Sequence, residues 1–327
     1  MQSLRSIRAA LLAACALLLN PVAYAQVFPT PGKPIRVVVP FPPGGQTDIQ
    51  ARALSVKLSN SLGVPVVVDN KPGASTILGA MDVVKSLPDG HTLLYTISVT
   101  ASQNPHLFSK LPYDPFKDLT PMMLAARSSV VLTVPVNSPY NTLKDLVDFA
   151  KRNPGKLNFG SFSAGSTSHL AGELLKQQAN IDIVHIPYKG SADAGLALLG
   201  GHIQMLFDGP TTAIANAKAG KVKLLGYVDE KRLSVLPDVP TMAEAGVAGV
   251  DLAGGMQFFG PAGMPPTLVT KVNTALAAAL RQPDIVKLYE ENGTEITASS
   301  PQEHARLLRE WYEKWGAIIR KLGLKLD

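Results

Sequence analysis

Two short segments of the sequence place glycine and hydroxyl side chains between a strand-like run and a helix-like run. The first segment covers residues 41–48 and the second covers residues 163–169. The first N–H groups of a helix have no partner within it and lie at the positive end of the helix dipole. A glycine beside them carries no Cβ, so an anion can approach the main chain closely. Each segment therefore predicts a site that holds a carboxylate by amides and hydroxyls rather than by a buried arginine.

The residues of these two segments are the candidate ligand-binding groups. They are Phe41, Pro43, Gly44, Gly45, Thr47, Asp48, Ser163, Ala164, Gly165, Ser166, Thr167, Ser168 and His169. Asp48 leaves two interpretations open, because a carboxylate repels a bound anion. Either it caps the helix and holds the glycine turn, or it orders water or a ligand hydroxyl. Phe41 and Phe162 likewise belong either to the core or to a wall that packs against an apolar part of a ligand.

The sequence contains no recognisable catalytic, metal or cofactor constellation. The residues around Ser163 resemble a serine-hydrolase elbow, but that motif needs glycine two residues earlier, where Ser161 stands. Neither Gly155-Lys156 nor Gly220-Lys221 has the earlier glycine that a phosphate-binding loop requires. The six histidines show no metal-ligand spacing. We therefore expect a protein that is not an enzyme and needs neither a metal nor a cofactor.

The N-terminus has the three parts of a secretory signal peptide. A basic stretch precedes the apolar run Ala9–Leu19, and a small-x-small cleavage site follows at residues 23–25. The run is too short to span a bilayer, which needs about 20 residues. One alternative is a lipoprotein signal in which Cys15 is acylated. Cleavage after Ala25 would instead give a periplasmic chain that begins at Gln26 and contains no cysteine.

Composition and charge exclude several classes of protein. The chain has 327 residues, of which 46% are hydrophobic and 17% charged, as in ordinary globular proteins. A mature chain of about 300 residues predicts two domains. The net charge of +6 includes two arginines of the signal peptide and is not concentrated in a basic cluster. This pattern favours a solvated surface over nucleic-acid binding, while a mild positive field would help to collect small anions.

The elements that would position the two segments form two series of alternating strands and helices. The first series has strands at residues 35–39, 64–68 and 92–97 and helices at 49–62 and 76–87. The second has strands at 157–162, 181–188, 204–208 and 223–228 and helices at 167–178, 192–199 and 211–219. Apolar strands separated by helices indicate parallel sheets covered on both faces.

Two further helices have clear N-terminal signals. Thr142 and Asp145 predict a capping box at the start of one helix. Ser300, Pro301 and Glu303 predict a second capping box at the start of a C-terminal helix. The apolar residues of this last helix recur every three or four positions, which predicts a stripe that faces the core.

Motifs along the whole mature chain resemble the receptors of tripartite tricarboxylate transporters, which are Bug-type periplasmic solute-binding proteins. They include Phe41-Pro42-Pro43-Gly44-Gly45 and Asn70-Lys71-Pro72-Gly73-Ala74. Others stand at residues 34–36, 88–94, 111–115, 153–157, 166–173, 187–190, 236–241 and 261–263. Because the motifs follow one another over the mature chain, the resemblance is more specific than any single motif.

The resemblance implies an α/β type II periplasmic-binding-protein fold with two lobes, two crossovers and a ligand cleft between the lobes. It places the signal peptide at residues 1–25, lobe 1 at 26–127 and 256–327, lobe 2 at 128–255, and the crossovers near 125–127 and 254–256. The two glycine and hydroxyl segments would then face each other across the cleft. Ser98, Thr100 and Asp208, which follow strands, would complete the pocket or serve only as loop residues.

The resemblance also implies a function and partners. The protein would capture a small carboxylate, in particular an aliphatic or aromatic dicarboxylate, by closure of the two lobes. As a monomer it would then deliver this ligand to membrane permease subunits. A sensory protein that presents its ligand to a membrane kinase is the main alternative, and a secreted hydrolase is a third. Gly209-Pro210 and residues 74–76 depart from the pattern common among relatives, so the pocket could differ in shape from theirs.

Overall fold

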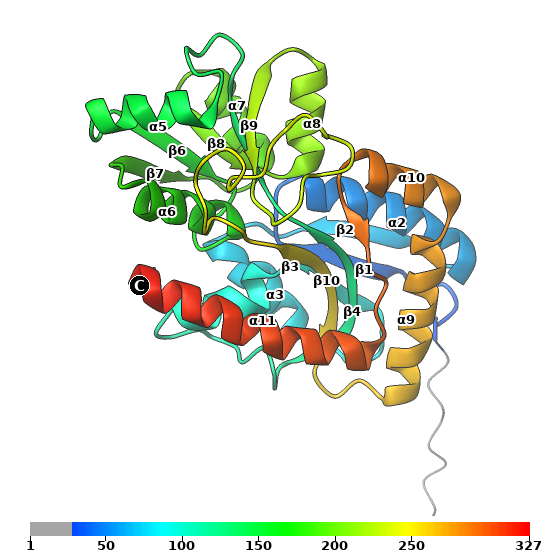
Figure 1. Ribbon diagram of the computed structural model, residues 1–327. Coiled ribbons are helices and arrows are strands. Elements are labelled where there is room, and N and C mark those ends of the chain that lie inside the picture. Colours follow the sequence, from blue (N-terminus) through cyan, green and yellow to red (C-terminus); the bar gives the residue numbers. More distant parts are fainter. Residues whose placement is uncertain (1–27) are drawn as a thin grey trace, which may run out of the picture.

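The computed structural model describes residues 28–327, and the predicted signal peptide lies outside them. In this part of the chain no helix combines the length and the apolar character needed to cross a membrane. Two lobes are visible in Figure 1, each built on a sheet with helices packed around it. The expected two-lobed α/β fold is therefore confirmed.

The first lobe contains a six-stranded sheet with the strand order β11-β4-β10-β3-β1-β2. Its strands are β1 (Ile35–Val39), β2 (Val66–Asn70), β3 (Thr92–Ile97), β4 (Leu119–Ser128), β10 (Gly254–Pro261) and β11 (Glu295–Ile296). Its α-helices are α2 (Gln46–Leu62), α3 (Ile77–Val84), α4 (Asn104–Leu107), α9 (Pro266–Leu280), α10 (Pro283–Glu291) and α11 (Pro301–Leu322). A 3-10 helix, η1 (Ala74–Thr76), precedes α3, and a π-helix, η2 (Val99–Gln103), precedes α4.

The second lobe contains a five-stranded sheet with the strand order β7-β6-β8-β5-β9. Its strands are β5 (Val131–Pro135), β6 (Leu157–Ser161), β7 (Ile183–Pro187), β8 (Met205–Asp208) and β9 (Val222–Tyr227). Its helices are α5 (Leu143–Arg152), α6 (Thr167–Ala179), α7 (Ser191–Leu199) and α8 (Pro210–Lys218). The glycine and hydroxyl segments thus lie before α2 in the first lobe and before α6 in the second.

The prediction of purely parallel sheets is wrong for the strands near the crossovers. β1, β2 and β3 are parallel, as are β6, β7 and β8. However, β10 is antiparallel to β3 and β4, and β5 is antiparallel to β8 and β9. Parallel neighbours need a long crossover connection, whereas a strand that enters a sheet from the other lobe can pair in the opposite direction.

The two predicted capping boxes have different outcomes. Thr142 accepts a hydrogen bond from the backbone of Asp145, whose carboxylate bonds back to the Thr142 N–H, so the first box is confirmed. Ser300 caps the backbone of Glu303 in the same way. The Glu303 carboxylate does not complete the second box, because it pairs with Arg306 on the next turn of α11.

Helix α11 packs against both lobes. Leu308 lies in an apolar cluster of the first lobe with Val38 and Phe259. About two and three turns later, Trp315 and Ile319 lie in the cluster that forms the core of the second lobe. In Figure 1 the helix accordingly runs along the first lobe and ends beside α6. The predicted apolar stripe therefore buries side chains in two cores rather than one.

One hydroxyl contacts both the outgoing and the returning segments that connect the lobes. Ser129 lies between β4 and β5, and its side chain is within hydrogen-bond distance of the carbonyls of Val228 and Leu252. Val228 follows β9, and Leu252 precedes β10, on the return path to the first lobe. These contacts join the outgoing and returning segments beside the cleft. The exact limits of the lobes, at residues 127/128 and 255/256, stay a prediction.

Candidate ligand-binding site

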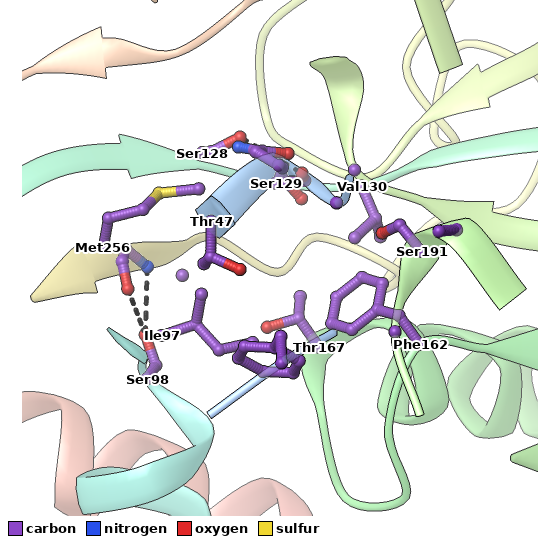
Figure 2. Close-up of a pocket in the computed structure, with 18 of the residues that line it drawn as sticks. Thr47, Ile97, Ser98, Ser128, Ser129, Val130, Phe162, Thr167, Ser191 and Met256 are labelled. Atoms are coloured by element: carbon purple, nitrogen blue, oxygen red, sulfur yellow. Dashed lines mark hydrogen bonds between the residues drawn. The ribbon is translucent and has the colours of Figure 1, made fainter. Parts of the chain in front are cut away.

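A cavity lies between the two lobes, and we call it the interlobe cavity. Figure 2 shows side chains from both lobes and from the connecting segments around it. The centre of a water-sized molecule can move through about 60 Å³ of this space. By this measure one water needs about 10–15 Å³, so the cavity accommodates about four to six water-sized groups.

The walls of the interlobe cavity come from three parts of the chain. The first lobe contributes Phe41, Pro42, Gly45, Gln46, Thr47, Ile97 and Ser98. The connecting segments contribute Ser128, Ser129, Val130, Gly254, Gly255 and Met256. The second lobe contributes Phe162, Thr167, Gly190, Ser191, Ala192 and Gly209. Among these residues, which all belong to the described range 28–327, none carries a charged side chain.

Four helices begin at the interlobe cavity. The N-cap or the first helical residue of α2, α6, α7 and α8 lines it, namely Gly45, Thr167, Gly190 and Gly209. The positive ends of these helix dipoles and their unpaired N–H groups lie at its walls. With no carboxylate among the lining side chains, this arrangement favours a bound anion.

The turn before α2 is held in place by Asp48. Gly44 adopts a left-handed conformation (φ +86°), which glycine tolerates best, and its N–H donates to the Asp48 carboxylate at 2.9 Å. Arg52 and Asn70 also donate to this carboxylate. Burial alone would raise the pKa of Asp48, but these hydrogen bonds outweigh it and hold the pKa below its usual value. Asp48 therefore orders the turn from behind and does not line the cavity.

The turn before α6 is held by a stacked histidine pair. The Gly165 N–H donates to Nδ1 of His169 at 3.0 Å, and the His169 ring stacks on His185 at 3.7 Å between centroids. Burial, and then the charge of a protonated His185, lower the pKa of His169 to about 3. The imidazole is therefore neutral near pH 7 and its Nδ1 remains able to accept the Gly165 hydrogen bond.

Five of the residues expected to bind ligand line the interlobe cavity: Phe41, Gly45, Thr47, Ser98 and Thr167. Pro43 and Gly44 lie on the exposed outer side of the first turn. The other residues expected in the site do not line the cavity: Asp48, Thr100, Ser163, Ala164, Gly165, Ser166, Ser168, His169 and Asp208.

Several hydroxyls of these residues outside the cavity wall form hydrogen bonds with other groups of the protein. Ser166 donates to the carbonyl of Ser163, and Ser168 donates to the carbonyl of Phe207. Thr100 lies in the first lobe and bonds to Thr76 at 2.8 Å. These hydrogen bonds shape the turns and the neighbouring core, so the cavity itself receives only part of each predicted segment.

Asp208 lies directly behind the cavity wall. It is 1% exposed, and its carboxylate accepts hydrogen bonds from the Gly209 N–H at 2.8 Å and from the Thr212 hydroxyl at 2.6 Å. Ser191, which lines the cavity, also bonds to it. Burial raises the pKa of Asp208 to about 6, although these hydrogen bonds act in the opposite direction. No lysine or arginine in the described chain pairs with this carboxylate.

Several lining residues were not among the predicted ligand-binding groups. Gly190 and Ser191 repeat the pattern of a strand, a glycine, a hydroxyl and a helix, so the same signal could have identified them. The connecting residues 128–130 and 254–256 carry no such signal. They reach the cavity because both segments pass between the lobes, which is a property of the topology.

Comparison with known proteins identifies the family of the chain. A profile described as the tripartite tricarboxylate transporter family receptor matches residues 50–324 of the chain. The chain belongs to this receptor family. The resemblance of the sequence motifs is thereby confirmed, as is the expectation of a solute-binding protein rather than an enzyme.

Three relatives illustrate how closely the receptor family is matched. A protein of Pseudomonas sp. (strain P51) is 37% identical over 298 residues, which cover 91% of this chain and 88% of that protein. The structure of R. palustris Rpa4515 with adipate is 32% identical, covers 91% of this chain and 99% of that chain, and has a TM-score of 0.88. The structure of MatC from Rhodopseudomonas palustris with bound malate is 31% identical. The match covers 89% of this chain and 100% of that chain, with a TM-score of 0.84.

Proposed function

We propose that this receptor captures a small dicarboxylate in the interlobe cavity and delivers it to the membrane permease subunits of a tripartite transporter. In this proposal the mature protein acts as a monomer in the periplasm after removal of its signal peptide. The observation that carries the proposal is the convergence of four helix N-termini, from both lobes, on a cavity without charged side chains.

Uncharged walls suit a carboxylate for a physical reason. A buried arginine would pay a large desolvation cost, whereas main-chain amides are already desolvated and oriented by the fold. The hydroxyls of Thr47 and Thr167 add donors at the starts of α2 and α6. An ammonium group would find no carboxylate partner on these walls, so the site favours simple anions over zwitterions.

The apolar part of the wall of the interlobe cavity suits a hydrocarbon segment of the ligand. Phe41 and Ile97 from the first lobe, Phe162 from the second, and Val130 and Met256 from the connecting segments supply apolar surface. A ligand with carboxylates at its ends and methylene groups between them would match this distribution. Adipate and malate, the ligands in the two related structures, are both dicarboxylates.

Lobe closure explains how modest contacts could give useful affinity. Micromolar binding requires about 8 kcal/mol. A hydrogen bond to a charged group contributes about 1.5–3 kcal/mol, and one partly buried helix terminus up to about 2 kcal/mol. Several donors from both lobes are therefore needed at once. Only the closed arrangement supplies them together, so the ligand stabilises closure and presents a closed receptor to the permease.

A thermal-shift screen of the mature protein against mono-, di- and tricarboxylates tests this proposal, followed by calorimetry on the strongest candidates. We expect saturable stabilisation by dicarboxylates, one-to-one binding and full recovery of the unchanged ligand. No stabilisation by any carboxylate would refute the proposed ligand class, and consumption of the ligand would point instead to a hydrolase. Loss of uptake on gene deletion, rather than loss of induction alone, would distinguish a transport receptor from a sensor.

A further inference from the structure

The side chain of Gln46 crosses the cleft from the first lobe to the second. Gln46 is the first residue of α2 and is 7% exposed. A Cβ placed on Gly209 would lie 2.3 Å from Oε1 of Gln46 and 3.7 Å from its Cβ. The glutamine therefore lies lengthwise against Gly209, the N-cap of α8, and both residues line the interlobe cavity.

The backbone at Gly209 does not itself require glycine. Its φ of −63° and ψ of 143° are accessible to any residue, and serine is generally a better N-cap than glycine. What a side chain at this position would meet is the amide of Gln46. Glycine at position 209 thus leaves room for the long side chain of Gln46 on the opposite wall.

The amide of Gln46 also contacts a residue of the neighbouring groove. Its Nε2 lies 3.4 Å from the hydroxyl of Thr294, which is itself 3% exposed. Thr294 lines a second, wider groove between the lobes that is bordered by Arg127 and Arg281. The space open to the centre of a water-sized molecule is about 710 Å³ in this groove and about 60 Å³ in the interlobe cavity. Gln46 therefore stands where the small cavity would otherwise continue toward the large groove.

We propose that Gln46, packed against Gly209, is the end wall of the interlobe cavity and limits the length of the ligand. This inference rests on the proposed function. It predicts preference for short dicarboxylates, such as succinate and glutarate, over pimelate and suberate. Shortening the side chain at this position would extend the cavity past α8 toward the groove, so that longer dicarboxylates would gain room.

Calorimetry on the full mature protein with succinate, glutarate, adipate, pimelate and suberate tests the inference. In Q46A we expect the affinity for pimelate relative to succinate to rise at least about tenfold, the lower range for one methylene in a fitted pocket. Q46N, which shortens the side chain by one methylene and keeps the amide, should give a smaller shift in the same direction. It also supplies the comparison if Q46A does not fold.

Gln50 offers a matched control on the same helix. Its Nε2 also donates to Thr294, at 3.2 Å, but it does not line the cavity. Q50A should therefore leave the order of preference among the five dicarboxylates unchanged. If Q50A shifted the preference as strongly as Q46A, the effect would arise from loosening Thr294 and the end-wall role would be refuted.

A paired substitution tests the contact itself. G209S should weaken dicarboxylate binding, because its side chain forces Gln46 into the cavity, and Q46A in the same chain should restore binding. Wild-type affinity in G209S, or an unchanged length preference in Q46A, would overturn the inference while the proposed function stands. Binding of no dicarboxylate by the wild-type protein would instead overturn the proposed function, and the inference with it.

Discussion

The hydroxyl of Ser98 accepts a hydrogen bond from the backbone N–H of Gly255 at a distance of 2.9 Å. Ser98 follows β3 in the first lobe, whereas Gly255 lies at the start of β10, where the chain returns from the second lobe. Both residues line the interlobe cavity, and Figure 2 shows Ser98 at its edge. This hydrogen bond joins the returning segment to the wall of the cavity. The same contact therefore belongs both to the connection between the two lobes and to the ligand site.

Replacement of Ser98 by alanine should destabilise the protein. The Gly255 N–H would lose its partner in a buried position, which costs about 1–3 kcal/mol. Ser102, four residues later, provides the control because its hydroxyl is buried and has no hydrogen-bond partner in the described structure. Urea unfolding should therefore show a loss for S98A and little or none for S102A. Equal losses in the two variants would contradict the assigned role of Ser98.

A negative charge at Gly45 should abolish carboxylate binding. Gly45 has an ordinary φ of −84°, and a Cβ there would lie 3.9 Å from Ser191, so alanine fits. Aspartate would place a carboxylate among the donors meant for the ligand and should weaken binding by at least about tenfold, the value of one charge-assisted hydrogen bond. Calorimetry should find that G45A binds and G45D does not. Similar affinities for the two variants would remove α2 from the proposed site.

Gly165 does not offer an equivalent test. It has a φ of +76°, and a Cβ there would lie 2.3 Å from the Leu107 side chain. Any substitution would therefore strain the backbone and disturb the packing between the second lobe and Leu107 of the first. A loss of binding in such a variant could not be separated from a loss of structure.

The stability contributed by Asp208 should decrease as the pH rises. Because burial raises its folded pKa to about 6, the folded protein binds this proton more tightly than the unfolded chain does between about pH 4 and 6. The free energy of unfolding then falls through this range, at about 1.4 kcal/mol for each pH unit. Between about pH 5 and 7.5, wild type should lose about 1–2 kcal/mol relative to D208N. Parallel pH profiles of the two proteins would contradict the raised pKa.

The same carboxylate should make ligand binding dependent on pH. Asp208 bonds to Gly209 and Ser191, which line the cavity, so its negative charge opposes a bound dicarboxylate. Binding should therefore favour the protonated form, and the affinity for succinate should increase between about pH 7.5 and 6. D208N should lack this increase. Calorimetry in buffers of different ionisation enthalpy would reveal proton uptake in wild type; its absence would disprove the coupling.

Replacement of Ser75 by glycine should stabilise the first lobe. Ala74, Ser75 and Thr76 all have positive φ, between 45° and 75°, which side chains with a Cβ rarely adopt. Glycine at position 75 would relieve strain and keep the backbone carbonyl that accepts from Asn104. The gain after the entropy loss of glycine should be about 0.5–1 kcal/mol in thermal or urea unfolding. S75A retains the Cβ and should show no gain; equal behaviour of S75G and S75A would contradict this account.

The sequence predicted the elements that carry strong local signals. The strand at Ile35–Val39 and the capping box at Thr142 and Asp145 have the expected positions, because apolar runs and caps act over a few residues. β4, β5, β10 and β11 were not predicted. Their pairing depends on where the chain crosses between lobes, over separations of more than 70 residues, which no local pattern specifies.

The candidate site was predictable for the same limited reason. Gly45 and Thr167 were found because each stands at a helix start with a recognisable composition. Gln46 lies in the first predicted segment, but its contact with Gly209 was not predicted. Gly254 was missed, since its role arises from contact across the cleft: a Cβ on Gly254 would lie 3.1 Å from the Thr167 hydroxyl. Such contacts form only when the two lobes are assembled. Neither segment therefore shows a periodic or compositional pattern that would predict them.

The central claim is that amides and hydroxyls from both lobes bind one carboxylate ligand in the interlobe cavity. A crystal structure of the mature protein with the tightest-binding dicarboxylate of the screen tests it most directly. We expect carboxylate oxygens at about 2.7–3.2 Å from donors at the starts of α2 and α6 or α7, near Gly45, Thr167 and Ser191. A dicarboxylate bound elsewhere, or held by one lobe alone, would contradict the claim.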